Sequence, residues 1–96
     1  MNEFRVSERG GRDLLDIYLF GIEAFGAHQA LRYQEDLDHC FQLLADHPGI
    51  GRYARNTRNG VRRHEHASHV IFYEEIDGGI LILAVAHAHQ LRDLSF

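Results

Sequence analysis

The sequence predicts an α+β fold, in which an N-terminal strand and an antiparallel helix hairpin are followed by a C-terminal antiparallel three-stranded meander. Three observations support this fold class. Apolar and polar residues alternate at the N-terminus, apolar residues then recur every three or four positions in two segments, and runs of β-branched and aromatic residues follow. This order of elements is typical of helices packed on one face of an antiparallel sheet.

The N-terminal half contains one predicted strand and two predicted helices. Residues Glu3–Ser7 alternate between apolar and polar, and Ser7 is a favourable N-cap for a helix over Arg9–Phe25. Gly26 follows where glycine commonly ends a helix, and the second helix ends before Pro48 because proline cannot continue it. Two helices with so short a link run antiparallel. Their apolar stripes are Leu14, Ile17, Tyr18, Ile22 and Phe25 in the first helix and Ala30, Tyr33, Leu37, Phe41 and Leu44 in the second.

The C-terminal half contains three predicted strands. They span about Val61–His66, His69–Ile76 and Ile80–His87, after a segment at positions 49–59 that we expect to be irregular. The sequence Asp-Gly-Gly at positions 77–79 is a hairpin turn signal between the last two strands. These strands provide the surface on which the apolar stripes of the two helices pack.

The middle predicted strand is apolar on both of its faces. Val70 and Phe72 point to one side, whereas Ile71 and Tyr73 point to the other. Because two helices can cover only one face of a small sheet, we expect the second face to stay exposed and apolar. Exposed apolar patches on small soluble domains usually mark a site for a partner.

Length and composition restrict the class of protein. The 96 residues are enough for one domain, 1–96, with one modest core. Cys40 is the only cysteine, which excludes an internal disulfide and a cysteine-based metal site. No apolar run approaches the roughly 20 residues needed to span a bilayer, and no basic-then-apolar leader opens the chain. We therefore expect a cytoplasmic protein.

The charges are unevenly distributed along the chain. The net charge is −4, lysine is absent, and half of the ten arginines lie at positions 52–63, where there is no Asp or Glu. The preceding segment, positions 35–46, carries four acids and no strong base. Guanidinium groups bind carboxylate and phosphate in a bidentate manner that lysine does not provide. The arginine-rich segment is either a solvated loop or a docking surface for an acidic partner segment or a nucleic acid.

Five sequence blocks resemble the ParE toxins of bacterial toxin–antitoxin modules, within the wider RelE/ParE superfamily. They occur in the family's order and spacing over nearly the whole chain. The blocks are Ser7…Asp13-Leu14…Ile17-Tyr18 with Phe25-Gly26, Leu43-Leu44-Ala45-Asp46-His47-Pro48-Gly49-Ile50-Gly51-Arg52, Gly60-Val61-Arg62, His69-Val70-Ile71-Phe72-Tyr73, and Val85-Ala86-His87.

This resemblance implies a toxin that inhibits DNA gyrase, acts without a catalytic residue, cofactor or metal, and is neutralised by a ParD-like ribbon-helix-helix antitoxin. DNA is then contacted only through the antitoxin. The expected antitoxin-binding residues are Arg52, Arg55, Arg58, Arg62, Arg63, Ile71 and Tyr73. The expected target-binding residues, at the end of the last strand and in the tail, are His87, His89, Arg92 and Phe96.

Two alternatives remain open at this point. RelE-like relatives are ribosome-dependent mRNA endonucleases, which need a general acid and base and cations for the scissile phosphate. The chain has histidines and arginines for such a site, but it has no lysine, and Leu91–Phe96 contains no Tyr or His. Many family members carry Arg where this chain has Ala84 and His89, so a weakly toxic protein that retains only antitoxin binding is the second alternative.

The histidines suggest a further possibility, a metal site. His64 and His66, like His87 and His89, place two imidazoles on one face of a strand, and imidazole binds zinc and nickel well. A site needs the two pairs to converge in space, which the sequence does not indicate, so we predict no metal. His69 is expected to be a hydrogen-bonded residue at the start of the central strand.

Overall fold

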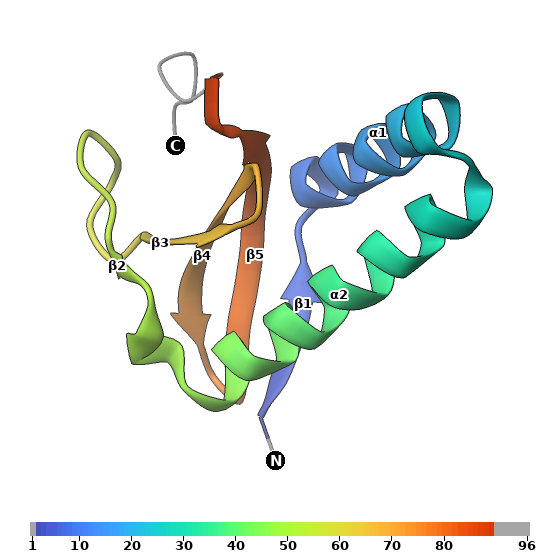
Figure 1. Ribbon diagram of the computed structural model, residues 1–96. Helices are drawn as coiled ribbons and strands as arrows, with labels where there is room; N and C mark the ends of the chain where they lie inside the picture. Colours follow the sequence, from blue (N-terminus) through green and yellow to red (C-terminus); the bar gives the residue numbers. More distant parts are fainter. Residues whose placement is uncertain (1, 90–96) are drawn as a thin grey trace.

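The computed structural model describes residues 2–89 and contains two helices on one side of a five-stranded sheet (Figure 1). The α+β class is therefore confirmed, although the sheet is larger than predicted. The elements are β1 (Glu3–Val6), α1 (Glu8–Phe25), α2 (Ala27–Asp46), the 3-10 helix η1 (Pro48–Ile50), β2 (Arg52–Tyr53), β3 (Arg62–His66), β4 (His69–Ile76) and β5 (Gly79–His87).

The helix hairpin begins and turns as the sequence predicts. The Ser7 hydroxyl accepts a hydrogen bond from the Gly10 backbone N–H at 3.0 Å, so Ser7 is the N-cap of α1. The same hydroxyl donates to the Leu83 carbonyl of β5 at 3.0 Å and thereby ties the helix start to the sheet. Gly26 alone separates α1 from α2, with φ of 91°, a backbone conformation that favours glycine.

The sheet has the strand order β1-β5-β4-β3-β2, which differs from the predicted meander at both edges. β3, β4 and β5 form the predicted antiparallel meander, and β1 pairs in parallel with β5. Parallel neighbours need a long crossover connection, and here all elements from α1 to β4 lie between β1 and β5 in the chain. β2 lies within the segment expected to be irregular and pairs antiparallel with β3. Its two residues are too few to show a strand periodicity.

The helix-facing side of the sheet contains the larger core. Residues of α2, including Leu37, Phe41 and Leu44, pack there against side chains of β4 and β5. The rings of Phe4 in β1 and Phe41 lie 5.4 Å apart between centroids. Cys40 is buried in this cluster and packs there as a small apolar side chain.

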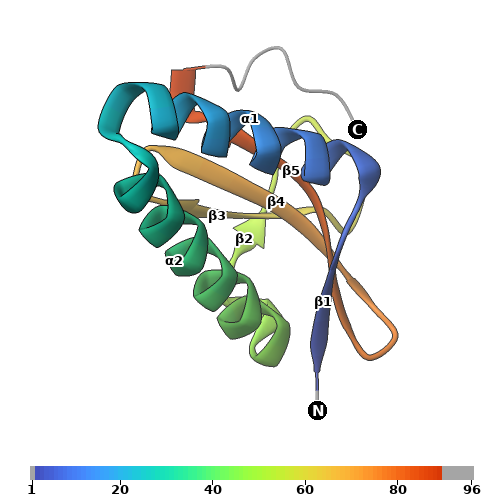
Figure 2. The same cartoon turned by 90° about the vertical axis from the view of Figure 1, so that its right-hand side faces the viewer.

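The second sheet face is buried, so the expectation that it stays exposed is wrong. Val70 and Phe72 are only 2% and 4% exposed. Val61 is buried in the same cluster, and Ala54 packs against it. Both belong to the β2–β3 segment (residues 54–61), which lies on the side of the sheet opposite the helices (Figures 1 and 2).

A β-bulge explains why two consecutive residues of β5 lie on the same face of the sheet. The pairing register of β4 with β5 shifts after Phe72, so that Phe72 pairs with Ala84 and Tyr73 pairs with Ile82. Leu83 is the additional residue. Leu83 and Ala84 consequently both belong to the second-face cluster, although they are consecutive in the chain.

Candidate functional site

The arginine-rich segment is paired largely with glutamates of β3 and β4. Arg52 lies 3.0 Å from a Glu65 carboxylate oxygen, and Arg63 lies 3.5 Å from the same oxygen. Arg62 lies 3.8 Å from Glu75. The segment is therefore less positive as a surface than its sequence suggests, because neighbouring strands supply the counter-charges.

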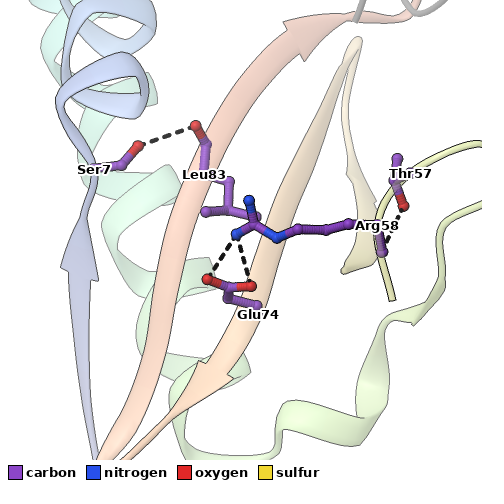
Figure 3. A network of polar contacts seen from close by, with 5 residues as sticks. All are labelled: Ser7, Thr57, Arg58, Glu74 and Leu83. Atoms are coloured by element: carbon purple, nitrogen blue, oxygen red, sulfur yellow. Dashed lines mark hydrogen bonds and ion pairs between the residues drawn. The ribbon is translucent and has the colours of Figure 1, made fainter. Parts of the chain in front are cut away.

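Arg58 reaches across the second sheet face to Glu74 of β4 (Figure 3). One terminal nitrogen of Arg58 donates to both carboxylate oxygens of Glu74 at 2.9 Å. The Thr57 hydroxyl donates within the same segment to the Ala54 carbonyl at 3.2 Å. These contacts position the β2–β3 segment against the second face, where Val61 is buried.

The Arg62 side chain is largely buried and makes its contacts within the protein. Its side chain is 17% exposed, compared with 68% for Arg52. The guanidinium donates to the Gly51 carbonyl at 2.7 Å and lies over the Tyr53 ring, 4.0 Å from the ring centroid. It also donates to the Tyr53 hydroxyl at 3.0 Å. Arg62 therefore positions the chain between η1 and β2.

The Tyr73 hydroxyl explains why glycine stands at position 51, within the block from Pro48 to Arg52. The Tyr73 hydroxyl donates to the Pro48 carbonyl at 2.7 Å and accepts from the Gly51 N–H at 2.8 Å. A Cβ atom on Gly51 would collide with that hydroxyl oxygen, so only glycine fits without displacement. Burial is the largest cause that raises the pKa of Tyr73 above its usual value.

Two of the expected antitoxin-binding residues need correction. Ile71 and Tyr73 are both 0% exposed and belong to the helix-facing core. Neither side chain offers surface to a partner, because α2 packs over the face to which they point. The alternation that the sequence predicts for β4 is right, and the face of Ile71 and Tyr73 is the one that the helices cover.

Histidines from three strands meet at the opposite end of the sheet. The Tyr33 hydroxyl of α2 lies 2.7 Å from Nδ1 of His69, and the Tyr33 ring lies 5.7 Å from that of His66. The His69 and His87 rings are 5.5 Å apart, and those of His87 and His89 are 3.9 Å apart. His69 is thus hydrogen-bonded as predicted, and its partner is a helix side chain.

In this histidine cluster (His66, His69, His87 and His89), burial favours the neutral forms of His69 and of its partner Tyr33. Burial, followed by His87 and His66, lowers the pKa of His69 below its ordinary value. Burial, followed by Asp36 and Cys40, raises the pKa of Tyr33 to about 12. Within residues 2–89, no group of three or more His, Cys, Asp or Glu side chains is arranged to hold a metal ion.

The remaining predicted site residues are distributed as follows. His87 is half-buried at the end of β5, and His89 is exposed just beyond it, whereas Arg92 and Phe96 lie outside the described residues. Arg52, Arg63 and His64 line an open pocket of about 250 Å³ together with Ile50 and Glu65. None of the described helices has the length and apolar character needed to cross a membrane.

Sequence reasoning did not identify the residues that neutralise the arginines or that hydrogen-bond to His69. Glu65, Glu74 and Tyr33 act through strand pairing or helix packing. The pairing of Glu65 with Arg63 could have been predicted from the alternation along one strand. Glu65 follows Arg63 by two residues on β3, so both side chains lie on the same face. Tyr33 carried no such signal, because its contact with His69 joins distant parts of the chain.

Comparison with known proteins gives a consistent result. The family model described as the ParE toxin of the type II toxin–antitoxin system parDE matches residues 4–92. Toxin ParE1 of Caulobacter vibrioides is 36% identical over 90 residues, which cover 94% of this chain and 91% of the relative. Toxin ParE1 of Mycobacterium tuberculosis is 29% identical over 93 residues, which cover 97% and 94% of the two chains.

A solved structure shares the fold. A chain of the chromosomal ParDE TA system from P. aeruginosa aligns with a TM-score of 0.75 at 22% sequence identity. The alignment covers 91% of this chain and 96% of that one. At this level of identity the likeness shows the fold alone.

Proposed function

Because the chain belongs to the ParE toxin family of type II toxin–antitoxin systems, we propose that it inhibits DNA gyrase and is neutralised by a ParD-like antitoxin. The observation that carries this proposal is the family match over residues 4–92, which supports one toxin domain over 1–96. The toxin acts in the cytoplasm, as an inhibitor rather than as an enzyme, and uses no cofactor. It contacts DNA only through its antitoxin.

The exposed arginines of the β2–β3 region are the proposed antitoxin surface. Arg52, Arg55 and Arg58 project from it, and Arg62 and Arg63 add positive charge from partly buried positions. An acidic antitoxin segment competes there with Glu65 and Glu74 for the guanidinium groups. The Arg52–Glu65 pair is exposed and contributes little to stability, so exchanging its partner costs little.

The end of β5 is the proposed target surface. His87 and His89 lie there. Arg92 and Phe96, which follow in the sequence, complete the set of proposed target-binding residues. Ala84 is 0% exposed, so an arginine could not be placed there without displacing the second-face core. Ala84 therefore belongs to the second-face core and adds no side chain to the proposed target surface.

A supercoiling assay tests the activity. Purified gyrase is incubated with relaxed plasmid, with and without the protein, and cleaved DNA is measured in parallel. We expect less supercoiling and more cleaved DNA. Normal supercoiling together with cleavage of ribosome-bound mRNA would replace this function with the endonuclease alternative. No effect in either assay, with antitoxin binding retained, would identify a protein that has lost toxicity.

Charge reversal tests the antitoxin surface separately. Arg52→Glu with Arg55→Glu should weaken binding of the ParD-like antitoxin about tenfold or more, because two exposed cations become anions. Arg32→Glu on α2 is the matched control, since this arginine is also exposed and lies on another element. Equal affinities of the double variant and the control would show that the arginine-rich segment is not the dock.

A third experiment tests the strand end. His89→Glu should reduce gyrase inhibition several-fold while antitoxin affinity stays unchanged, because it alters only the proposed target surface. His39→Glu, at an exposed position on α2, serves as the control. Loss of antitoxin binding with intact inhibition would instead assign the end of β5 to the antitoxin.

A further inference from the structure

The outer side of α1 carries exposed leucines. Leu15 and Leu19 are 55% and 52% exposed. They lie opposite the residues that face the molecule, since Gly10 approaches the Ile82 carbonyl of β5 and Gly21 approaches Ala30 of α2. No described helix or strand lies over this outer side (Figure 2). Large exposed leucines on a well-formed helix indicate a contact that the isolated chain does not make.

The spacing along this face is that of a coiled-coil seam. Arg12, Leu15, Leu19 and Ile22 follow one another at steps of three, four and three residues. This 3.5-residue repeat keeps one narrow stripe of a helix facing another helix. Ile22 is half-buried, so the stripe continues from the exposed leucines toward the hairpin turn.

The same face is complementary in charge to itself. Arg12 precedes the two leucines and Glu23 follows them. The midpoint of Leu15 and Leu19 is residue 17, and the midpoint of Arg12 and Glu23 lies about half a residue further, or roughly 0.75 Å along the helix. One two-fold axis at this point therefore brings Leu15 against Leu19 and Arg12 against Glu23 at once.

The local charges also favour this occupant over an acidic one. Glu8, Asp16 and Glu23 accompany Arg12 on or beside the outer side of α1, so the surface is acidic overall. Arg12 pairs with Glu8 at 3.2 Å, but both side chains are largely exposed, and such a pair exchanges readily. A second copy offers an arginine to Glu23 and a glutamate to Arg12 in the required order, whereas an acidic partner segment offers Glu23 no cation.

We propose that the outer side of α1 is a self-association surface, on which a second copy of this chain packs its own α1 antiparallel. Leu15 and Leu19 form the apolar centre, and two Arg12–Glu23 pairs close the ends. This interface is independent of the proposed gyrase and antitoxin surfaces. It is small, so the dimer is weak and its population depends on protein concentration.

Sedimentation equilibrium of the full chain tests the proposal. The unmodified protein should show a concentration-dependent monomer–dimer equilibrium, and Leu15→Asp with Leu19→Asp should raise the dissociation constant about tenfold or more. Leu43→Asp, at an exposed leucine of α2, is the matched control and should leave the equilibrium unchanged. Circular dichroism of each variant verifies that the helices are retained.

Charge exchange distinguishes this geometry from others. Arg12→Glu and Glu23→Arg should each weaken the dimer, and the two together should restore it, because the pairs re-form with reversed signs. A chain that stays monomeric throughout, or a double variant no better than the single ones, would overturn the proposal. If the chain is monomeric and the Leu15→Asp, Leu19→Asp variant loses antitoxin binding, the face belongs to the antitoxin.

Discussion

The two faces of the sheet are both buried, yet they are covered in different ways. The helix-facing side packs against α1 and α2, whose backbone groups are paired within the helices. The second face is covered in part by the irregular β2–β3 segment, which depends on the Arg58–Glu74 pair and a few turn contacts. A face covered by regular structure is rigid, whereas one covered by a loop can adjust when its side chains or its partner change.

Truncation of consecutive residues on β5 measures this difference most directly. Ile82 faces the helices and Leu83 faces the β2–β3 segment, and conversion of either to Ala removes the same number of carbon atoms. Ile82→Ala should cost about 4 kcal/mol in the free energy of unfolding, and Leu83→Ala about 2 kcal/mol. Rigid helices leave the first cavity open, whereas the segment can close over the second.

Urea denaturation of the two variants gives both values. Equal losses, or a larger loss for Leu83→Ala, would mean that the β2–β3 segment packs as rigidly as the helices do.

The hydroxyl of Tyr73 provides the next largest effect, on the helix-facing side. Tyr73→Phe leaves the Gly51 N–H and the Pro48 carbonyl without their partner, and we expect a loss of about 1–3 kcal/mol. Tyr53→Phe is the matched control, because its hydroxyl is exposed and accepts only from Arg62 among the described contacts. A thermal melt in which both variants resemble the unmodified protein would contradict the role of this network.

The Arg58–Glu74 pair tests the cover of the second face. A double-mutant cycle with Arg58→Ala and Glu74→Gln should give a coupling energy of up to about 1 kcal/mol, since the pair is partly shielded from solvent. The exposed Arg12–Glu8 pair of α1 should give less, about 0.3–0.5 kcal/mol. Each Arg58 or Glu74 variant should also speed amide exchange in residues 54–61. Zero coupling would show that other contacts position the segment.

Histidine titration should give the smallest effect, at the far end of the helix-facing side. The pKa of His69 is lowered in the folded protein, so the unfolded chain binds more protons as the pH falls. Stability is fully present above the unfolded pKa, near 6.5, and decreases as the pH falls from there toward the lowered value. His69→Gln should flatten this decrease between pH 7.5 and 5.5 in urea titrations.

His39→Gln, on the exposed side of α2, is the control for the loss of an imidazole. A His69→Gln variant with an unchanged slope would assign the dependence to other groups.

Much of the fold could be predicted because its signals are local. Ser7 as N-cap, Gly26 between the helices and Pro48 after α2 all act through their own neighbours, and each was found where expected. The β4–β5 hairpin follows from its turn and its β-branched residues in the same way. Two features of the sheet were not predicted from the sequence, namely β2 and the pairing of β1 with β5. Both depend on contacts between distant segments.

The candidate site was less predictable than the fold. The arginines were identified correctly as a cluster, but the pairs of Arg52 with Glu65 and of Arg58 with Glu74 join different elements, whose placement had to be known first. Ile71 and Tyr73 were expected to bind the antitoxin but lie beneath the helices, because alternation tells which residues share a face and does not tell which face the helices cover. The bulge at Leu83 likewise has no signature in a uniformly apolar strand.

The amino-acid sequence by itself determined the two helices, the three-stranded meander and the resemblance to ParE toxins, because propensity, capping and motif spacing act over short stretches of chain. Only the tertiary structure decided which sheet face the helices cover, which acids pair with the arginines, and that Leu15 and Leu19 stay exposed. These depend on the placement of segments that are distant in sequence, and their energies arise when that placement brings the side chains into contact.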